Sequence, residues 1–135
     1  MFLLDTDTII FSLKGSQTVR HHLERHVNEP MAISAITLME LYYGAYKSQK
    51  VTGNLAKIKK LEQVFEIIPI EIDSVEIFGM LKAGLEQSGT PLDDFDLVIA
   101  ACALSHNLTL VTNNQKHFRR IEGLRLENWA SGHGP

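Results

Sequence analysis

The sequence predicts an α/β fold in which helices cover a mainly parallel sheet. Short apolar runs such as Phe2–Leu4 have the length and composition of strands buried on both faces, as in parallel sheets. Longer segments with helical periodicity separate these runs, an alternation typical of βαβ units. The chain has 135 residues without internal repeats or a linker. We therefore expect a single domain over residues 1–130, followed by a flexible tail at 131–135.

Capping residues and prolines mark where several of the predicted helices and strands begin or end. Thr6 or Asp7 can cap the first helix and Ser34 a later one, because their side chains accept hydrogen bonds from free N–H groups. Pro30 ends a helix, and Pro69 marks an edge-type strand, since proline cannot donate to a ladder. The expected elements are strand 2–4, helix 6–13, helix 17–29, strand 31–33, helix 35–46, helix 54–65, strand 67–70, helix 74–87, helix 94–106, strand 109–112, a short turn or helix 117–121 and strand 125–128.

The composition limits the classes of function. The formal net charge is −3, with 13 Lys and Arg against 16 Asp and Glu, so binding to RNA or DNA would depend on local basic patches or a metal site. The single cysteine, Cys102, lies in an apolar run expected in the core, and it cannot form an internal disulfide, which fits the cytoplasm. Asp5 interrupts the apolar start, which argues against a signal peptide, and no segment approaches the ~20 apolar residues of a membrane span.

Glu40 lies in a predicted helix whose other residues, such as Ile36 and Tyr42, are mostly apolar. We expect this helix to be largely buried, and a buried ionised carboxylate is costly unless it is paired or binds a metal. The residues from Thr37 to Glu40 also match a capping box, in which Glu40 would serve only the helix start. Ser34 is the better cap, because the helical period already includes the residues that follow it.

Asp96 follows Asp93 and Asp94 at the start of an apolar helix. Acids in a first turn favour the helix macrodipole, and one of them can cap the helix. Three acids beside a helix with almost no polar face exceed what capping requires. We therefore expect Asp96 to have a functional role, and Asp93 and Asp94 to be cap and solvent residues.

Polar residues also mark the ends of two predicted strands. Asp5 follows strand 2–4, with Asp7 close by, and Thr112 and Asn114 mark the end of strand 109–112. The carboxyl ends of parallel strands share one edge, where open α/β sheets bind ligands. An Asn-rich turn without a function is the alternative at 112–114.

The acids at positions 5, 40 and 96 are expected to converge. Clustered carboxylates repel one another and their pKa values rise unless a cation neutralises them. Oxygen ligands favour Mg²⁺ or Mn²⁺ over zinc. Such a site can activate water and bind a phosphate oxygen, as metal-assisted phosphodiester hydrolysis requires.

Two other kinds of active site match parts of the sequence. His22 and His26 have the spacing of a zinc-protease helix, but Leu23 replaces the required Glu, so we expect them on a solvated face. The first strand and the residues up to Thr8 match the Asp-x-Asp-x-Thr motif of haloacid-dehalogenase-like phosphatases, with Asp5 as nucleophile. The later acids occur in the wrong order for that family.

Four motifs in order resemble the PIN-domain ribonucleases, and specifically the VapC-type toxins of bacterial toxin–antitoxin pairs. They lie at Phe2–Ile10, Ser34–Ala45, Gly89–Ala101 and Leu110–Trp129 and cover nearly the whole chain. Two positions depart from the family pattern. Asp7 stands where the family usually has Asn, and Asn114 stands where many relatives carry a fourth acid. The resemblance implies a PIN-like three-layer α/β/α fold with a short, mainly parallel sheet of four to five strands.

The resemblance also implies a metal-dependent endoribonuclease that hydrolyses RNA, with tRNA as an expected substrate, and thereby inhibits translation and growth. It assigns Mg²⁺ or Mn²⁺ to Asp5 and Asp96, with Glu40 bound directly or through water, and lets Thr112 and Asn114 orient water or metal. Activated water would attack a phosphodiester in line and leave a 5′-phosphate and a 3′-hydroxyl. A catalytically inactive PIN interaction module is the alternative.

Family members usually dimerise and are silenced by an antitoxin, so the resemblance implies a homodimer bound to a VapB-type antitoxin in a heterotetramer or larger complex. Tyr42, Tyr43 and the helix Leu55–Phe65 are candidates for the antitoxin surface, although a buried core would use the two tyrosines equally well. The candidates for contacts to RNA phosphates, or for a solvated charged face, are Lys47, Lys50, Arg119 and Arg120.

Overall fold

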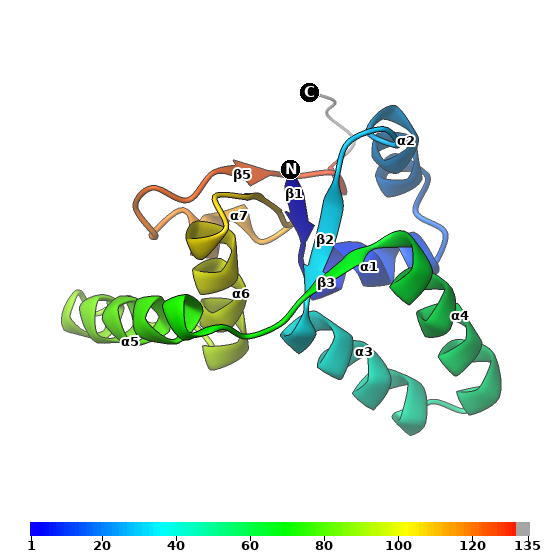
Figure 1. The fold of residues 1–135 in the computed structure, drawn as a ribbon, viewed down its shortest axis with the longest axis horizontal. Helices are drawn as coiled ribbons and strands as arrows, with labels where there is room; N and C mark the ends of the chain where they lie inside the picture. The colour runs from blue at the N-terminus through cyan, green and yellow to red at the C-terminus, as the bar shows by residue number, and fades with distance from the viewer. Residues whose placement is uncertain (132–135) are drawn as a thin grey trace.

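The computed structural model describes residues 1–131, in which helices and strands alternate along the chain (Figure 1). The tail predicted at 131–135 lies outside these residues except for Ser131. Each helix in the described part is too short or too polar to span a membrane. The elements are β1 (Phe2–Leu4), α1 (Thr6–Leu13), α2 (Gln17–Arg25), β2 (Met31–Ser34), α3 (Ala35–Lys47), α4 (Val51–Val64), β3 (Glu66–Ile68), α5 (Ile72–Gln87), α6 (Asp94–Ser105), β4 (Thr109–Val111), α7 (Gln115–Phe118) and β5 (Leu126–Glu127).

The strands form one parallel sheet with the order β3-β2-β1-β4-β5. In its centre, Leu3 of β1 lies opposite Ala32 of β2 and Leu110 of β4. The chain adds β2 and β3 on one side of β1 and then crosses to place β4 and β5 on the other. The strand order therefore reverses between β1 and β4, and open α/β sheets bind ligands beyond the carboxyl ends of strands at such a reversal.

Helices cover both faces of the sheet. Alternate strand residues point to opposite faces, so Leu3 and Leu110 pack with α5, α6 and α7, while Leu4 and Val111 pack with α1, α3 and α4. Figure 1 shows α5, α6 and α7 on one side of the strands and α1 to α4 on the other. Leu3 and Leu4 are fully buried, and burying each side chain stabilises the fold by roughly 2 kcal/mol. The predicted three-layer α/β/α class with a parallel sheet is confirmed.

Some predicted boundaries are wrong. Helix α1 is capped by Asp5, not by Thr6 or Asp7, because the Asp5 side chain accepts a hydrogen bond from the Thr8 N–H at 2.9 Å. Helix α4 begins at Val51 instead of residue 54, and α5 begins at Ile72; neither helix has a side-chain hydrogen bond at its cap. The polar residues from which these starts were predicted therefore do not cap the helices, and other contacts determine where the helices begin. The predicted edge strand is confirmed as β3, and Cys102 is buried as expected.

Helix α3 is amphipathic, although its composition predicts burial on all sides. Met39, Tyr43 and Tyr46 are 56%, 67% and 66% exposed. Their spacing of four and three residues places them on one face of the helix. The apolar composition therefore reflects a solvent-facing stripe as well as a core-facing one, and Glu40 is only partly buried.

The solvated face expected from the sequence is not formed by His22 of α2 and His26, the residue that caps the end of this helix. His22 is 8% exposed, and its ring and that of His26 lie parallel to the indole of Trp129, with centroids 5.6 and 5.0 Å away. The Phe2 ring meets the indole edge-on at 5.2 Å. We call these four residues the histidine–tryptophan cluster. The prediction failed because Trp129 lies more than a hundred positions along the chain from its histidine partners.

Candidate active site

Asp5 and Thr112 lie where the strand order reverses. β1 ends at Leu4 and β4 at Val111, which are opposite each other in the sheet, so the next residue of each strand emerges at the same edge. The N–H of Asp5 donates to the Val111 carbonyl at 3.0 Å. Both polar side chains are buried. The two strand ends therefore meet, as their sequence pattern predicts.

The Asp5 carboxylate is held by the residues around it. It accepts the capping hydrogen bond from Thr8, whose hydroxyl donates to the Val111 carbonyl at 3.2 Å and so ties α1 to β4. Burial raises the pKa of Asp5, and the charge of Asp7 adds to the rise. Hydrogen bonds from Thr112 and Thr8 act in the opposite direction. Asp5 is thus a fixed, buried acid whose ionised form is only partly compensated.

Glu40 approaches the same edge from α3. This helix follows β2 directly, and Ser34 caps it by accepting a hydrogen bond from the Thr37 N–H at 3.2 Å. The alternative capping box with Glu40 is therefore not used. The Thr6 hydroxyl donates to Glu40 Oε1 at 2.6 Å, and this bond joins the first turn of α1 to α3.

Two residues near the site, Thr6 and Thr37, were missed by the sequence analysis. Their hydroxyl oxygens lie 3.2 Å apart, and the Ser34 hydroxyl lies 3.5 Å from that of Thr37. A signal was present, because Thr37 is three residues before Glu40 and so shares its helix face. Thr6 gave no comparable signal, because its partner lies on a different helix.

Electrostatic interactions connect the acids. Burial raises the pKa of Glu40, and Asp7, Asp93 and Asp5 raise it further. Burial raises the pKa of Asp96 to about 6, together with the charges of Asp93, Asp5, Glu40 and Asp7. The same carboxylates thus act on one another from the end of β1, from α1 and α3, and from the start of α6. We call Asp5, Asp7, Glu40, Asp93 and Asp96 the acid cluster.

No Lys, Arg or His within residues 1–131 forms an ion pair with the acid cluster. The neighbouring Asp94 is paired with Lys82 at 3.0 Å. In the same part of the chain, no three His, Cys, Asp or Glu residues are grouped so that they could hold a metal ion. The acids therefore raise one another's pKa without an ion-pair partner, and they do not surround one common point.

Asn114 lies beside the site but its side chain points to another partner. Its N–H donates to the Thr112 hydroxyl at 2.9 Å, while its side-chain nitrogen lies 2.8 Å from Nδ1 of His117. The structure therefore anchors Asn114 next to a residue that contacts Asp5. The described contacts of its amide do not include a carboxylate.

The four predicted phosphate-binding cations are exposed, and of the four only Lys47 lies within a helix, α3. The Lys47 ammonium lies 5.5 Å from the centre of the Tyr43 ring. Arg120 donates to the Pro91 carbonyl at 3.5 Å, just before α6. Lys50 precedes α4, and Arg119 follows α7. None of them neutralises the acid cluster through an ion pair in the described chain.

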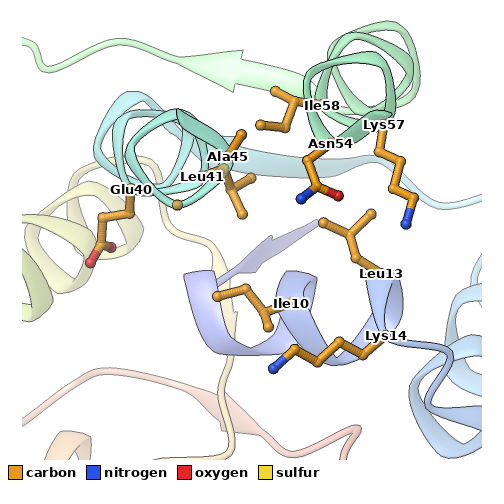
Figure 2. A pocket seen from close by; sticks show the side chains of 10 residues that line it. Ile10, Leu13, Lys14, Glu40, Leu41, Ala45, Asn54, Lys57 and Ile58 are labelled. Carbon is orange, nitrogen blue, oxygen red and sulfur yellow. The ribbon is translucent and has the colours of Figure 1, made fainter. Parts of the chain in front are cut away.

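An apolar cavity of about 360 Å³ lies between α1, α3 and α4. Figure 2 shows Ile10, Leu13 and Ile58 facing it, with Glu40 at one end and Lys57 at the other. Glu40 belongs both to this cavity and to the acid cluster. A ligand that occupied the cavity would therefore reach the candidate active site.

Known proteins resemble this chain over almost its whole length. Residues 2–124 match the family model of the PIN domain. The tRNA(fMet)-specific endonuclease VapC of Salmonella typhimurium is 39% identical over 130 residues, covering 96% of this chain and 98% of that protein. Ribonuclease VapC2 of Rickettsia felis is also 39% identical, over 131 residues, with the same coverage.

Solved structures agree with these matches. A chain in the crystal structure of VapBC2 from Rickettsia felis, bound to a promoter DNA fragment, superposes with a TM-score of 0.90 at 38% identity, covering 95% of this chain and 98% of that chain. The DNA-bound VapBC of Salmonella typhimurium gives 0.89 at 39% identity, covering 95% and 97%. The chain belongs to the PIN-domain family and, within it, to the VapC ribonucleases.

Proposed function

We propose that this protein is a metal-dependent endoribonuclease toxin that hydrolyses phosphodiester bonds of RNA, with tRNA as the expected substrate class. The acid cluster carries the proposal. In a chain of this family, acids on or beside α1, α3 and α6 act on one another near the reversal of strand order and have no cationic partner in the described residues. The relative from Salmonella typhimurium is named for its action on tRNA(fMet), which supports tRNA as the first class to test.

The chemistry of the side chains fits Mg²⁺, with Mn²⁺ as a second choice. Every candidate donor is an oxygen, and such donors favour these hard cations. Mg²⁺ retains several waters and is often bound by only one or two carboxylates. It therefore suits acids that act on one another electrostatically without surrounding one common point. We assign direct binding to Asp5 and Asp96, and direct or water-mediated binding to Glu40.

Within this site, the bound cation would neutralise charge and lower the pKa of a water molecule. Asp5 is fixed by Thr8 and supported by Thr112, so its position depends little on substrate. Glu40 is held in one orientation by Thr6, which suits a group that positions water. We assign the orientation of water or cation to Thr112 and to the adjacent Asn114.

A VapB-type antitoxin is the proposed partner, and a homodimer within a heterotetramer or larger complex is the proposed assembly. The solved structures from Rickettsia felis and Salmonella typhimurium are of VapBC bound to DNA, which supports a partner of this kind. We place an apolar antitoxin segment in the cavity between α1, α3 and α4, since it ends at Glu40. Tyr42 of α3 donates to Glu62 of α4 at 2.7 Å, whereas Tyr43 is exposed for contact. We place this complex in the cytoplasm, in keeping with the unpaired Cys102.

RNA cleavage by the purified protein, with Mg²⁺, Mn²⁺ or a chelator, tests the proposal. We expect cleavage that needs the added cation and is lost in Asp5→Asn and Asp96→Asn, while the control Asp94→Asn retains it. Asp5→Asn is preferred to Asp5→Ala because Asn caps helices as well as Asp does. Sequencing the RNA ends after brief expression would identify the substrate.

Three results would contradict the proposal. Cleavage retained in both variants would reject the site assignment. Absence of cleavage with every cation and RNA class would favour an inactive interaction module. Hydrolysis of a phosphomonoester through a phosphoaspartate at Asp5 would favour the phosphatase interpretation, which the family match and Glu40 oppose.

A further inference from the structure

Four basic side chains lie close together in the sequence, on and directly after α7. They are Lys116, His117, Arg119 and Arg120, and we call them the α7 patch. All four are exposed, and residues 113–121 contain no acid, in a chain whose formal net charge is −3. None of the four forms an ion pair with a carboxylate within residues 1–131. The patch is therefore a local concentration of positive charge that the described chain does not neutralise.

Two buried apolar residues fix the backbone of the α7 patch. Phe118 and Ile121 both belong to the core on the α5 and α6 side of the sheet. The Ile121 N–H donates to the Phe118 carbonyl at 3.0 Å, and the Arg119 N–H donates to the Gln115 carbonyl at 2.8 Å. The basic side chains thus extend into solvent from a backbone that is already ordered. A ligand that binds them has less ordering entropy to overcome.

One end of the α7 patch adjoins the candidate active site through Asn114. The Asn114 N–H donates to the Thr112 hydroxyl at 2.9 Å. Thr112 follows β4 at the edge where Asp5 follows β1. The Asn114 side-chain nitrogen lies 2.8 Å from Nδ1 of His117, whereas Nε2 of that ring makes no hydrogen bond in the described chain. The imidazole is therefore held beside the site with one ring nitrogen free for a ligand.

The other end of the α7 patch contacts the segment that leads into α6. Arg120 donates to the Pro91 carbonyl at 3.5 Å. Asp93 caps α6 two residues after Pro91, and Asp96 lies in the first turn of this helix. The patch therefore adjoins two of the segments that carry residues of the candidate site, the end of β4 and the start of α6.

An RNA substrate has to approach this site against the charge of the acid cluster. A cation at the scissile phosphate would offset the repulsion at that point only, and the neighbouring phosphates would still face carboxylates. Lys and Arg are the usual partners of such phosphates, and these contacts fix the register of the nucleic acid. The planar fork of arginine also matches a phosphate in two hydrogen bonds. Unpaired cations beside the acids meet this requirement.

We propose that the α7 patch binds the RNA phosphates next to the bond that is cleaved, and that Asn114 also positions His117 for one of these contacts. This proposal rests on the proposed function, because it takes RNA as the substrate. It also separates the cations that the sequence offered for phosphate binding. Arg119 and Arg120 lie on the RNA path, whereas Lys47 and Lys50, at the end of α3 and before α4, lie outside it.

Binding of a fluorescently labelled tRNA transcript, measured by anisotropy in the presence of a chelator, tests the proposal without cleavage. Arg119→Gln combined with Arg120→Gln should weaken binding roughly tenfold at low salt. The slope of log K against log salt should become shallower by roughly 0.7–0.9 for each lost contact. His117→Ala should weaken binding by about two- to threefold.

The matched control replaces two other exposed arginines, Arg20 and Arg25 of α2, by Gln. This helix ends next to His26, whose ring meets that of Phe2 with centroids 4.8 Å apart, at the start of β1 and so away from the edge that carries Asp5. The control removes the same charge from the chain. It should bind the transcript within about twofold of the natural chain.

Steady-state cleavage with Mg²⁺ distinguishes contact with RNA from support of the fold, because Arg120 also holds the Pro91 carbonyl. Loss of a phosphate contact should raise KM and leave kcat within about twofold, whereas displacement of the start of α6 would lower kcat. Arg119 makes no side-chain hydrogen bond or ion pair in the described residues, so Arg119→Gln alone reports on RNA and should raise KM about threefold.

Four results would overturn the proposal. Equal losses in the two arginine pairs would show that only overall charge matters. Unchanged RNA binding in Arg119→Gln with Arg120→Gln would remove the patch from the RNA path, including the case in which Lys47→Gln with Lys50→Gln loses binding instead. A lower kcat at unchanged KM would assign Arg120 to the fold. Lost binding of polyglutamate with RNA binding unchanged would assign the patch to an acidic protein segment.

These results leave the proposed function intact as long as the natural chain cleaves RNA with Mg²⁺. Absence of both RNA binding and cleavage in the natural chain would instead reject the proposed function, and the role of the α7 patch with it.

Discussion

The acid cluster and the histidine–tryptophan cluster both gather titratable side chains, but they treat charge in opposite ways. In the acid cluster, carboxylates raise one another's pKa and have no cationic partner in the described residues. In the histidine–tryptophan cluster, burial lowers the pKa of His22, and the charges of Arg25, His26 and His21 lower it further while Glu127 opposes them. The imidazole is thus favoured as a neutral ring stacked on Trp129.

We infer from this difference that the histidine–tryptophan cluster serves stability and that the acid cluster serves the proposed activity. A neutral imidazole can pack against the indole as part of the apolar core, although His22 Nδ1 is buried without a hydrogen-bond partner. Acids without a cationic partner repel one another, and natural proteins keep such arrangements mainly where a ligand compensates for them. Variants that remove one cluster should therefore affect stability, and variants that remove the other should affect activity.

The largest expected effect comes from removing the indole. Trp129 is 1% exposed and contacts Phe2, His22 and His26, while its N–H donates to Glu127 at 2.9 Å. Trp129→Ala should lower the free energy of unfolding by about 3–5 kcal/mol, measured by urea denaturation with circular dichroism. A loss below about 1 kcal/mol would show that the cluster is peripheral. Tyr46→Ala, at an exposed aromatic residue, is the control and should cost little.

The next effect concerns the acid cluster, where a substitution should reduce activity and not stability. Asp96→Asn should reduce cation-dependent RNA cleavage by roughly 10²–10³-fold, because it removes a proposed ligand. Without added cation the same variant should unfold at an equal or higher urea concentration, since it relieves repulsion between acids. If cleavage activity and resistance to urea both fell, Asp96 would serve the stability of the fold instead.

A smaller effect concerns the bond between α1 and α3. Thr6→Val keeps the shape of the side chain but removes the hydrogen bond to Glu40, which is worth about 1.5–3 kcal/mol for a charged acceptor. We expect cleavage to fall about tenfold, with the loss mainly in kcat, because the position of Glu40 is disturbed. Thr52→Val, on the exposed side of α4, is the matched control. Equal activity of both variants would remove Thr6 from the site.

The smallest effect is a pH dependence with opposite signs in the two clusters. The folded state holds the Asp96 proton more tightly than the unfolded chain does, so this contribution to stability is complete below pH 3.8 and is lost as the pH rises through about 6. Allowing for partial exposure, it amounts to about 1 kcal/mol. His22 has a lowered pKa, so its contribution is complete above 6.5 and is lost as the pH falls below that value.

Thermal unfolding between pH 4.5 and 8 can separate the two contributions. Asp96→Asn should flatten the decline in stability toward neutral pH, and His22→Phe should flatten the decline toward acid. Mg²⁺ should restore stability at neutral pH in the natural chain but not in Asp96→Asn. An unchanged profile in both variants would assign the pH dependence to other groups.

The two clusters also show how far sequence reasoning extends. Asp5 and Thr112 were predictable as neighbours, because a buried apolar run fixes each strand and parallel strands share a carboxyl edge. Glu40 was predictable from the helix that carries it, although the supposed burial of that helix was wrong. The bond from Thr6, the coupling of Asp7 and the stacking on Trp129 depend on contacts between elements far apart in the chain. No local pattern encodes those contacts.

Asp5 follows a strand, caps a helix and carries a charge of the candidate site, and only the last of these distinguishes it from asparagine. Asn satisfies the same cap, so a chain with Asn at this position would remain folded and keep its cavity between α1, α3 and α4. In a cell that also makes active toxin, such a chain would be a decoy. It would occupy the proposed antitoxin without cleaving RNA, and so release active toxin from inhibition.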